Sequence, residues 1–378
     1  MPTCWRALAE IAAGGQRVAA RIDGAVHAAR RAAWAGIEAR HGAIPGIVVA
    51  DKTLAGVTGL RLDATVVPCH SDKEGAEPNF KGFGLHPLGC WCDNTGEPLA
   101  GMLRPGSAGS NTAADHIKVL GEAVAALASR PGHQLIYSAG WALGQREKNA
   151  ITAVPPQAWQ IAVDHRGEVR ERRAEDACAD TGCAHRKCWV EEAHVTELTA
   201  LLRQGRAGDS LAGWPATMRV FARRERPHPG AQLTLFEAED GWRYSLWVTN
   251  LPKHASGWRG QPACIDAAHT VHARVEDAIR TGKDTGIGKF PSRGLSLNRA
   301  WFTAALTAAA LLSWLRLLAL DGDLAKTEPK TLRYRILHAA GRLAHSGRRR
   351  RLKISATWPW APAIVTAWDR IAALPHPP

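Results

Sequence analysis

Residues 60–128 pass through three short β-prone segments, separated by turn signals, and then become helical. The segments are 60–67, 83–92 and 98–104, and the helix is expected from Asn111 or Thr112 to Leu127. Asn94 and Gly96 precede the third segment and tolerate the positive φ that a hairpin turn needs. This β-β-β-α order predicts a layered α/β fold, because helices must cover the apolar faces of the strands.

The remaining segments differ in character on either side of the middle of the chain. Residues 1–42 are rich in Ala and Arg and have helical periodicity, and residues 265–340 are helical again. Between them we expect a strand at 134–138 and three β-like runs, at 218–224, 231–237 and 242–249. Asp240-Gly241 is a hairpin signal between the last two runs. These runs predict a β-rich insertion in the middle of the chain.

Composition limits the class of protein. The chain has 378 residues, which suggests two or three structural units. Its 46% apolar and 22% charged residues are typical of globular proteins and exclude a disordered chain. Forty-eight Lys and Arg against 35 Asp and Glu leave a net charge of +13, which suits a polyanionic partner such as nucleic acid. A soluble protein from a lineage rich in Arg and Ala is the alternative.

Cysteine usage and hydropathy point to a soluble cytoplasmic protein. Eight cysteines are sparse for this length, which indicates a reducing compartment. The first residues lack the basic and apolar regions of a signal peptide. The most apolar stretch, 300–315, is shorter than the roughly 20 residues of a membrane span, so we expect a buried helix there and no membrane contact.

Several long strings of the sequence resemble the DDE transposases of bacterial insertion sequences, and the resemblance extends from about residue 5 to 374. The strings include Asp63-Ala64-Thr65, His70-Ser71-Asp72-Lys73-Glu74, Phe80-Lys81-Gly82-Phe83-Gly84-Leu85-His86-Pro87-Leu88, Gly96-Glu97-Pro98-Leu99-Ala100-Gly101, Arg104-Pro105-Gly106, Ser110-Asn111-Thr112, Arg223-Arg224-Glu225-Arg226-Pro227-His228-Pro229-Gly230-Ala231-Gln232, Glu276-Asp277, Ile279-Arg280 and Lys283-Asp284-Thr285-Gly286.

The resemblance implies an α/β, ribonuclease-H-like mixed sheet with helices, interrupted by a β-rich insertion subdomain. We accordingly expect five parts: a helical N-terminal remnant at 1–45, the first part of the ribonuclease-H-like domain at 46–140, the β-rich insertion at 141–260, the second part of the domain at 261–340, and a basic C-terminal tail at 341–378.

The activity that the resemblance implies is metal-dependent cleavage of DNA strands and their transfer to target DNA. In the family, three carboxylates hold two divalent cations, Mg²⁺ or Mn²⁺, which activate the attacking oxygen and stabilise the leaving oxygen. The implied partners are double-stranded DNA, at the element ends and the target, and a second copy in a homodimer. The implied location is the cytoplasm, in association with the nucleoid.

Two of the three carboxylates can be carried over from the family. Asp63 matches the first, on the first strand, and Glu276 matches the third, on a helix. Lys283 follows seven residues later on the same helical face and matches a lysine that contacts DNA phosphate, and we also expect DNA contact from Arg280. Without the family context, Asp63 would be an exposed strand residue, and Glu276 with Lys283 an ordinary solvated helix face.

The second carboxylate of the family has no counterpart in its expected interval. Residues 128–133 contain no Asp or Glu, and a strand with its Asp and the following helix, roughly 25–35 residues, is missing there. Asp115 and Asp164 lie nearby in sequence but lack the motif context. Either the strand of Asp63 becomes an unpaired edge, or residues 135–138 move in to pair with it. We predict a truncated, degenerate copy that is impaired as a catalyst.

Other departures from the family pattern agree with decay. His269 and His272 stand where many relatives have Tyr and Arg before the catalytic Glu, and the N-terminal region that binds element ends is shortened. The alternative to an enzyme is a non-catalytic DNA-binding relic, or an inhibitor that pairs with an intact transposase.

Two further features could carry a function of their own. Cys178, Cys183, His185 and Cys188 could bind zinc, or could form a polar loop of incidental cysteines. The basic run 348–353, which begins with Arg348, Arg349 and Arg350, could bind DNA phosphates or be a solvated tail. The tryptophans of the insertion, 189, 214, 242 and 247, could stack on an unpaired base or belong to the core.

Overall fold

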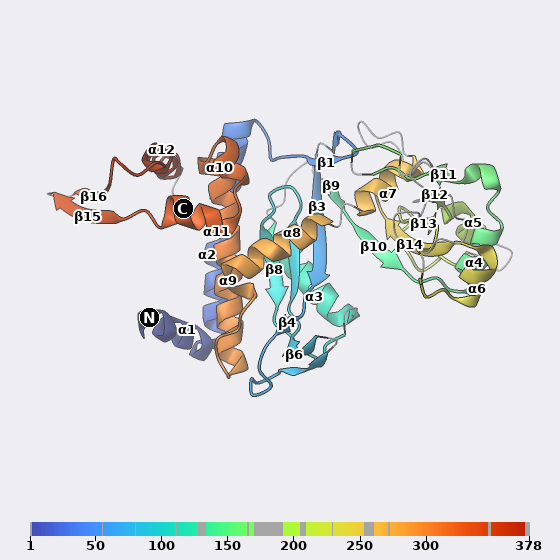
Figure 1. Ribbon diagram of the computed structural model, residues 1–378, viewed down its shortest axis with the longest axis horizontal. Coiled ribbons are helices and arrows are strands. Elements are labelled where there is room, and N and C mark those ends of the chain that lie inside the picture. Colours follow the sequence, from blue (N-terminus) through green and yellow to red (C-terminus); the bar gives the residue numbers. More distant parts are fainter. Residues whose placement is uncertain are drawn as a thin grey trace. The chain divides into compact units, whose positions relative to one another are not determined.

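The computed structural model describes a mixed α/β protein whose chain forms two compact units (Figure 1). Unit 1 comprises residues 1–45, 60–131 and 274–378, and unit 2 comprises 46–59 and 132–273. The residues described are 2–54, 56–79, 81–109, 112–127, 134–164, 166–169, 192–204, 209–228, 230–252, 261–270, 273–346 and 349–374.

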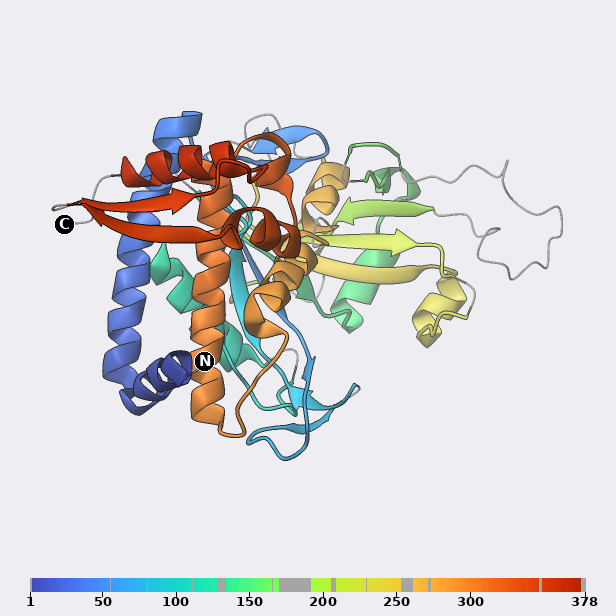
Figure 2. The ribbon, with the colours of Figure 1, turned by 60° about the vertical axis from the view of Figure 1, so that its left-hand side comes forward.

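Unit 1 begins with two helices and ends with a largely helical segment. Its helices are α1 (Pro2–Ala13), α2 (Gly15–His41), α3 (Ala113–Ala126), α8 (Ala273–Gly282), the π-helical turn η4 (Lys283–Ile287), α9 (Leu295–Ala319), α10 (Gly322–Lys326), α11 (Pro329–Leu332), the π-helical turn η5 (Arg333–Leu337) and α12 (Ala361–Ala372). Figures 1 and 2 both show α2 and α9, far apart in sequence, running side by side.

The sheet of unit 1 consists of the three antiparallel strands expected from the sequence. They are β3 (Val57–Ala64), β7 (Leu88–Cys92) and β8 (Pro98–Met102), in the order β8-β7-β3. The turn signal at 93–97 joins β7 to β8, and the helix α3 follows with Thr112 at its N-cap. The predicted order of three strands before a helix holds for this sheet, but the expected segment 83–92 is divided between β7 and a separate strand, β6 (Gly82–Leu85), which belongs to another sheet.

The two faces of this sheet differ in what covers them. Leu88, Cys90 and Cys92 alternate along β7 and join a core with the buried residues of α3, such as Val119 and Ala123. The opposite face carries Gly89 and Trp91, and Trp91 contacts Val275 and Ile279 of α8. This division follows from the two-residue period of a strand.

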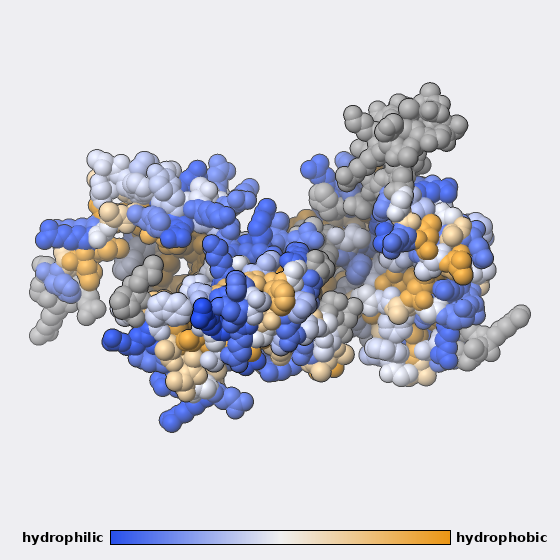
Figure 3. All heavy atoms as spheres, turned by 60° about the horizontal axis from the view of Figure 1, so that its bottom comes forward, coloured by the Kyte–Doolittle hydropathy of each residue, from blue (hydrophilic) through white to orange (hydrophobic). Residues whose placement is uncertain are grey.

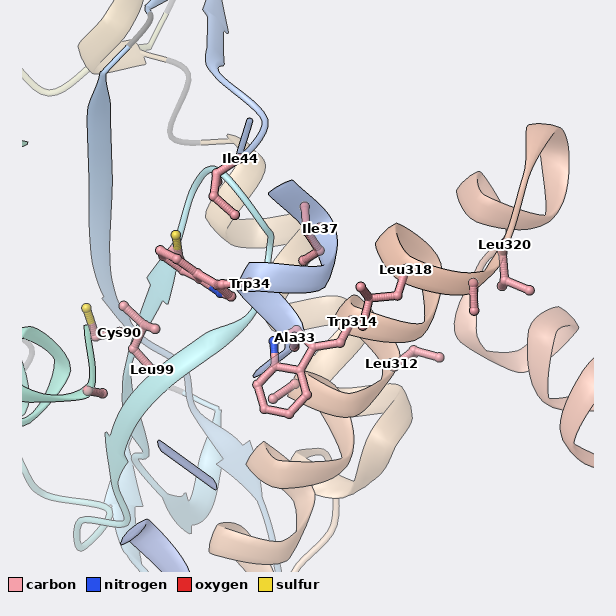
Figure 4. Close-up of a cluster of buried hydrophobic side chains, with 14 of the residues drawn as sticks. Ala33, Trp34, Ile37, Ile44, Cys90, Leu99, Leu312, Trp314, Leu318 and Leu320 are labelled. Carbon is pink, nitrogen blue, oxygen red and sulfur yellow. The ribbon is translucent and has the colours of Figure 1, made fainter. Parts of the chain in front are cut away.

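The core of unit 1 extends to the two long helices. Trp34 and Ile37 of α2 pack with Trp314 and Leu318 of α9, as Figure 4 shows together with Leu99 of β8. All five side chains are buried. At roughly 25 cal/mol per Å² of apolar surface, a core of this kind is the main source of the unit's stability.

A fully buried carboxylate, Glu97, joins α2 and α9 to the β7–β8 turn. Arg30 donates from Nε at 2.9 Å, and the indole nitrogens of Trp34 and Trp314 donate at 2.5 and 2.8 Å. Thr95 adds a hydroxyl at 3.0 Å. A buried charge is tolerated only when it is paired and hydrogen-bonded in this way.

A second, small sheet of unit 1 contains β4 (Val67–Pro68), β6 (Gly82–Leu85) and β5 (Glu77–Asn79) in that order. The loop between β4 and β5 anchors the start of α9. Glu74 accepts a hydrogen bond from the backbone N–H of Leu295 at 2.8 Å, and Lys73 donates to the carbonyl of Ser292 at 3.0 Å. The family-like string 70–74 therefore holds the N-terminus of α9 in place.

The apolar stretch 300–315 lies within α9, a helix of 25 residues that is long and apolar enough to span a bilayer by length and composition. Half of its most apolar window is buried inside the protein. Phe302, Trp314 and Leu318 belong to the buried set, as expected for a core helix.

Unit 2 is built on a five-stranded antiparallel sheet of order β10-β14-β13-β12-β11. Its strands and helices are β1 (Ile47–Val49), β2 (Lys52–Leu54), β9 (Gln134–Ile136), β10 (Ser138–Trp141), α4 (Gln145–Thr152), the 3₁₀ turn η1 (Pro156–Ala158), β11 (Gln160–Ile161), β12 (Ala193–Glu197), α5 (Thr199–Arg203), β13 (Arg219–Glu225), α6 (Leu235–Asp240), β14 (Arg243–Thr249) and α7 (Pro262–Thr270).

Helices cover both faces of this sheet. Phe221 and Trp247, opposite each other on β13 and β14, pack with Ile265 of α7. On the other face, Val220 and Leu246 join the core that includes α4 and α5. The expected strands at 218–224 and 242–249 are therefore present.

The expected strand at 231–237 is wrong, because the chain forms helix α6 there instead. Thr234 and Glu237 make a capping box, in which the Glu237 carboxylate accepts hydrogen bonds from the N–H and hydroxyl of Thr234. Asp240-Gly241, expected as a hairpin turn, ends this helix, with Gly241 at φ 76°. Local capping outweighed the β propensity of the run.

The strand after α3 pairs with the beginning of β3. Gln134–Ile136 (β9) runs parallel to residues 57–59, and this pairing ends at Gly59. Residues 60–64 pair with β7 on one side, and among the described residues no strand pairs with their other side. We expected either an unpaired edge or pairing with residues 135–138. Pairing occurs at residues 57–59, and an edge without a described partner occurs at 60–64.

Within the range 341–378, which we expected as a basic tail, the structure has two strands and a helix. Strands β15 (Gly341–Ser346) and β16 (Arg349–Ile354) form an antiparallel hairpin, and α12 follows.

Candidate functional site

Asp63 lies near the end of β3, the strand that borders the sheet of unit 1. Its side chain is half-buried, and its Oδ1 accepts a hydrogen bond from the backbone N–H of Ala64 at 2.7 Å. Across the sheet it faces Gly89 of β7, whereas Leu62 and Ala64 face Cys90 and Leu88. Asp63 therefore points away from the face that α3 helps to cover.

Trp91 lies on the same sheet face as Asp63, because it is two residues beyond Gly89 on β7. Its indole ring covers Gly89, where a Cβ atom would stand only 2.4 Å from the ring. The ring is buried against Val275 and Ile279 of α8. Helix α8 is thereby fixed over the face that carries Asp63.

Glu276 is in the first turn of α8, adjacent to Val275, and its side chain is exposed. The helix is amphipathic: Val275 and Ile279 are buried on the sheet side. The position of α8 therefore brings Glu276 to the layer above the sheet face of Asp63, and neither carboxylate is enclosed by packed side chains.

Lys283 follows α8 at the start of the π-helical turn η4. Burial lowers the pKa of its ammonium group, and the charge of Lys81 lowers it further, whereas the charge of Asp63 raises it. Lys283 is thus within range of the charges of both Asp63 and Lys81. The site thus combines a carboxylate with two cations.

The string Lys283-Asp284-Thr285-Gly286 has a structural explanation at each of its other positions. Asp284 pairs with Lys330 at 3.2 Å, and Thr285 donates to the carbonyl of Gly282 at 2.9 Å. Gly286 has φ 131°, which favours glycine, and its carbonyl accepts from the Trp301 indole at 2.8 Å. These contacts hold η4 against α9 and so fix the position of the Lys283 backbone.

Arg280 lies on the exposed side of α8. It pairs with Asp277 at 3.1 Å and stands 3.8 Å from Glu328, and all three side chains are exposed. Exposed pairs of this kind contribute little to stability, so the Arg280 guanidinium is available for other contacts.

The two candidate substitutes for the second carboxylate are engaged elsewhere. Asp115 is in α3, on the other side of the sheet from Asp63, and pairs with buried Arg104 at 3.2 Å. Asp164, in unit 2, accepts hydrogen bonds from the N–H groups of Arg166 and Glu168 in its own turn. Within the described ranges no three His, Cys, Asp or Glu residues are grouped as a metal site would require.

Several predicted positions fall outside the described residues. These are the interval 128–133, the zinc candidates Cys178, Cys183, His185 and Cys188, His272, Trp189 and Arg348. Arg349 and Arg350 begin strand β16.

His269 and the described tryptophans of the predicted insertion lie in unit 2, and each has defined contacts there. His269 stacks on Trp247 with ring centroids 4.9 Å apart, and its Nδ1 is 2.5 Å from the Ser138 hydroxyl. Trp247 is a core residue, and the guanidinium groups of Arg224 and Arg226 lie over the ring of Trp242, at 4.6 and 4.1 Å from its centroid. Trp214 is exposed and contacts Trp141.

Sequence reasoning missed Lys81, Gly89 and Trp91 as parts of the site. Lys81 stands within one of the family-like strings, which was the only signal for it. Gly89 and Trp91 follow from strand parity once the register with β3 is known.

The fold and the site define a class: a mixed α/β protein with an acidic residue on a sheet face and a glutamate on the helix over that face, next to lysines. Over residues 15–376, nearly the whole chain, the sequence matches the family described as Transposase DDE domain group 1. The chain belongs to this family of DDE transposases. No curated protein matches it.

Proposed function

We propose that the chain is the DNA transposase of an insertion sequence and that its strand-cleavage chemistry centres on Asp63 and Glu276. One observation carries the assignment: α8 packs through Val275 and Ile279 on Trp91, which shares a sheet face with Asp63. Two acidic residues 213 positions apart in sequence thus belong to adjoining layers of one unit.

The proposed catalytic fold is ribonuclease-H-like. The order of elements supports it: the antiparallel strands β3, β7 and β8 come first, then helix α3, then β9 parallel to the first strand. In the sequence, the strands of the five-stranded sheet of unit 2 lie between these elements and α8, and this sheet corresponds to the proposed insertion.

The donor atoms of the proposed site suit a hard divalent cation, Mg²⁺ or Mn²⁺. Asp63 and Glu276 both offer carboxylate oxygens, which these cations prefer. When bound, such cations supply Lewis-acid activation of the attacking oxygen and stabilisation of the leaving oxygen. The residues of this chain would hold the cations and orient the DNA strand.

Lysine and arginine side chains near the carboxylates are the proposed contacts to DNA phosphates. The charges of Asp63 and Lys81 both act on Lys283, and Arg280 is exposed one helical turn after Glu276. Cations at these positions would place the scissile phosphate beside the carboxylates and offset the repulsion between them. A homodimer bound to duplex DNA at the nucleoid is the proposed working form.

We further propose that this copy is impaired, because a strand and a helix that carry the second carboxylate are missing. Two features support the loss. Residues 60–64 lack a described partner strand on one side. Helix α3 exposes the apolar stripe Ile117, Leu120 and Val124, at helical spacing i, i+3 and i+7. A strand–helix unit added beside β3 would cover both.

A labelled element-end duplex, incubated with Mg²⁺ or Mn²⁺, tests both parts of the proposal. We expect the chain itself to nick the duplex only near background. Inserting the strand–helix unit of an intact relative between residues 127 and 134 should restore cleavage. In that restored protein, Asp63→Ala and Glu276→Ala should each abolish it, whereas Asp277→Asn, next to Glu276, should not.

The outcomes separate the two claims. Efficient cleavage by the unmodified chain that disappears in Asp63→Ala would show that the impairment is wrong and the site correct. Cleavage by the restored protein that survives Asp63→Ala and Glu276→Ala would show that the site is wrong.

The second candidate is a non-catalytic DNA-binding relic that inhibits an intact transposase by pairing with it. The side of residues 60–64 that has no described partner strand favours this candidate, since an open strand edge is a template for pairing with another chain. Adding the chain to an intact transposase of the same element should then lower cleavage in proportion to the amount added. Unchanged cleavage would exclude inhibition.

A further inference from the structure

The hairpin of β15 and β16 has two chemically different faces. Opposed residues of an antiparallel pair share a face, so the pairs Arg342–Lys353 and Ala344–Arg351 fix one face, whereas Leu343–Leu352 and His345–Arg350 belong to the other. The first face carries Arg342, Arg351 and Lys353. All three side chains are exposed. Arg342 and Lys353 are opposed, and Arg351 stands two residues from Lys353, so the three cations lie within about 7 Å along the ribbon.

The strands of this ribbon contact chiefly each other, and Figure 1 shows the ribbon projecting to the left of α2 and α9. Leu343 and Leu352 are 55% and 50% exposed, so they do not belong to the core. In Figure 3, strongly hydrophilic and hydrophobic residues lie side by side at the left end of the molecule, where the ribbon projects. An isolated two-stranded ribbon is only marginally stable in water, so the exposed ribbon is not explained by its own stability.

The base of the ribbon is held firmly. Tyr334, Trp358 and Trp360 pack edge to face, with ring centroids 5.5–5.9 Å apart. The Trp358 indole also donates a hydrogen bond to the carbonyl of Arg335 at 2.8 Å. These residues flank the two strands in sequence, so the aromatic group fixes the direction in which the ribbon leaves unit 1.

The charge arrangement on the first face is unfavourable for the isolated protein. Arg342 stands directly opposite Lys353, and like charges at opposed positions destabilise a strand pair. No carboxylate in the described part of the chain pairs with either residue or with Arg351. A polyanion laid along this face would remove the repulsion and release its own counterions.

We propose that the β15–β16 ribbon binds the phosphate backbone of duplex DNA through Arg342, Arg351 and Lys353, independently of base sequence. The inference rests on the proposed function for the identity of the polyanion and extends it to a surface apart from Asp63 and Glu276. Backbone contacts of this kind position a protein on DNA and carry no sequence information themselves. Leu343 and Leu352 face away from the bound backbone.

The test is the salt dependence of binding to a fluorescent 30-base-pair duplex of random sequence, measured in EDTA so that no metal at Asp63 contributes. Each phosphate contact changes the slope of log K against log salt by about 0.9. The variant Arg342→Gln/Arg351→Gln/Lys353→Gln should therefore have a slope shallower by about 2.7 and roughly tenfold or more weaker binding at moderate salt.

Two controls make the result specific. Arg146→Gln/Arg243→Gln/Lys326→Gln removes the same charge from exposed positions elsewhere and should leave most of the slope unchanged. Leu343→Thr/Leu352→Thr alters the other face of the ribbon while keeping β propensity, and should leave DNA binding unchanged. Circular dichroism and thermal melting confirm that each variant is folded.

An unchanged slope in the ribbon variant, or an equal change in the scattered-charge control, overturns the proposal while the DNA-binding function stands. Loss of binding in the leucine variant but not in the cation variant also overturns it and points to a protein partner. If the unmodified chain binds no duplex, both the ribbon proposal and the DNA-binding part of the proposed function fail.

Discussion

The indole of Trp91 lies directly over Gly89, and a single methyl group at position 89 would stand 2.4 Å from the ring. Because Gly89 faces Asp63 across the β3–β7 pair, this contact determines what lies beside the carboxylate. It also determines where α8 sits, since Trp91 is the residue on which Val275 and Ile279 pack.

Replacing Gly89 with alanine should therefore displace Trp91 and loosen α8. We expect Gly89→Ala to lower the free energy of unfolding by about 1–3 kcal/mol, as overpacking of a core usually does. Urea denaturation followed by tryptophan fluorescence measures it. The matched control is Gly121→Ala in α3, where a Cβ meets nothing within 4 Å and helix propensity should make the change neutral or stabilising. Equal effects of the two substitutions would contradict the prediction.

The buried Glu97 offers a second test of what holds unit 1 together. Glu97→Ala leaves Arg30 buried without its partner and two indole N–H groups without an acceptor, and should cost roughly 3–5 kcal/mol of unfolding free energy. Chemical denaturation checks the value. Asp277→Asn, which removes one partner of an exposed pair, should barely change it. A cost for Glu97→Ala as small as that of the control would show that the network contributes little.

The apolar stripe on α3 should respond differently from the core side of the same helix. Ile117→Gln/Leu120→Gln/Val124→Gln changes exposed residues, so stability should move by no more than about 0.5 kcal/mol per site, while binding of an apolar dye falls. Val119→Gln, at a fully buried position of α3, should destabilise the fold strongly. Similar destabilisation by both variants would mean that the stripe is covered in solution.

The thiols of Cys90 and Cys92 should make the protein sensitive to alkali. Burial raises the pKa of both thiols from 9.0 to about 12. The folded state therefore keeps protons that the unfolded state releases above pH 9, so stability present below pH 9 is lost as the pH rises towards 12.

Over that range each thiol should lower the unfolding free energy by about 1.4 kcal/mol per pH unit. Urea titrations at several pH values measure the slope. Cys90→Ala/Cys92→Ala should be less stable at neutral pH but show a slope shallower by about 2.7 kcal/mol per unit. An unchanged slope in the double variant would contradict the assignment.

The lowered pKa of Lys283 predicts how DNA affinity depends on pH. A lysine binds phosphate when protonated, so its contribution should disappear as the pH rises through a value below 10.5. Lys283→Arg should keep its affinity to higher pH, and Lys283→Gln should weaken binding at neutral pH and remove this step. Lys118→Gln, exposed on α3, is the control and should leave the pH profile unchanged. A profile that is the same for all three variants would exclude a contact between Lys283 and DNA.

Local signals were sufficient for much of the fold. The turn at 93–97 and the start of a helix after Thr112 depend on neighbours within a few positions, and both occur, as do strands within 60–64, 88–92 and 98–102. The run 231–237 shows the limit, because its β propensity competed with an equally local capping box and lost. The family resemblance singled out Asp63, Glu276 and Lys283 before any geometry was available.

Which residues surround those positions depended on contacts between distant parts of the chain. Strand parity places Trp91 beside Asp63 only once the β3–β7 register is known, and α8 reaches the same face through a contact between Trp91 and Val275, 184 residues apart. Composition and periodicity assign residues to strands and helices. They do not say which face of a sheet a remote helix covers, because that choice is made by packing shape over the whole core.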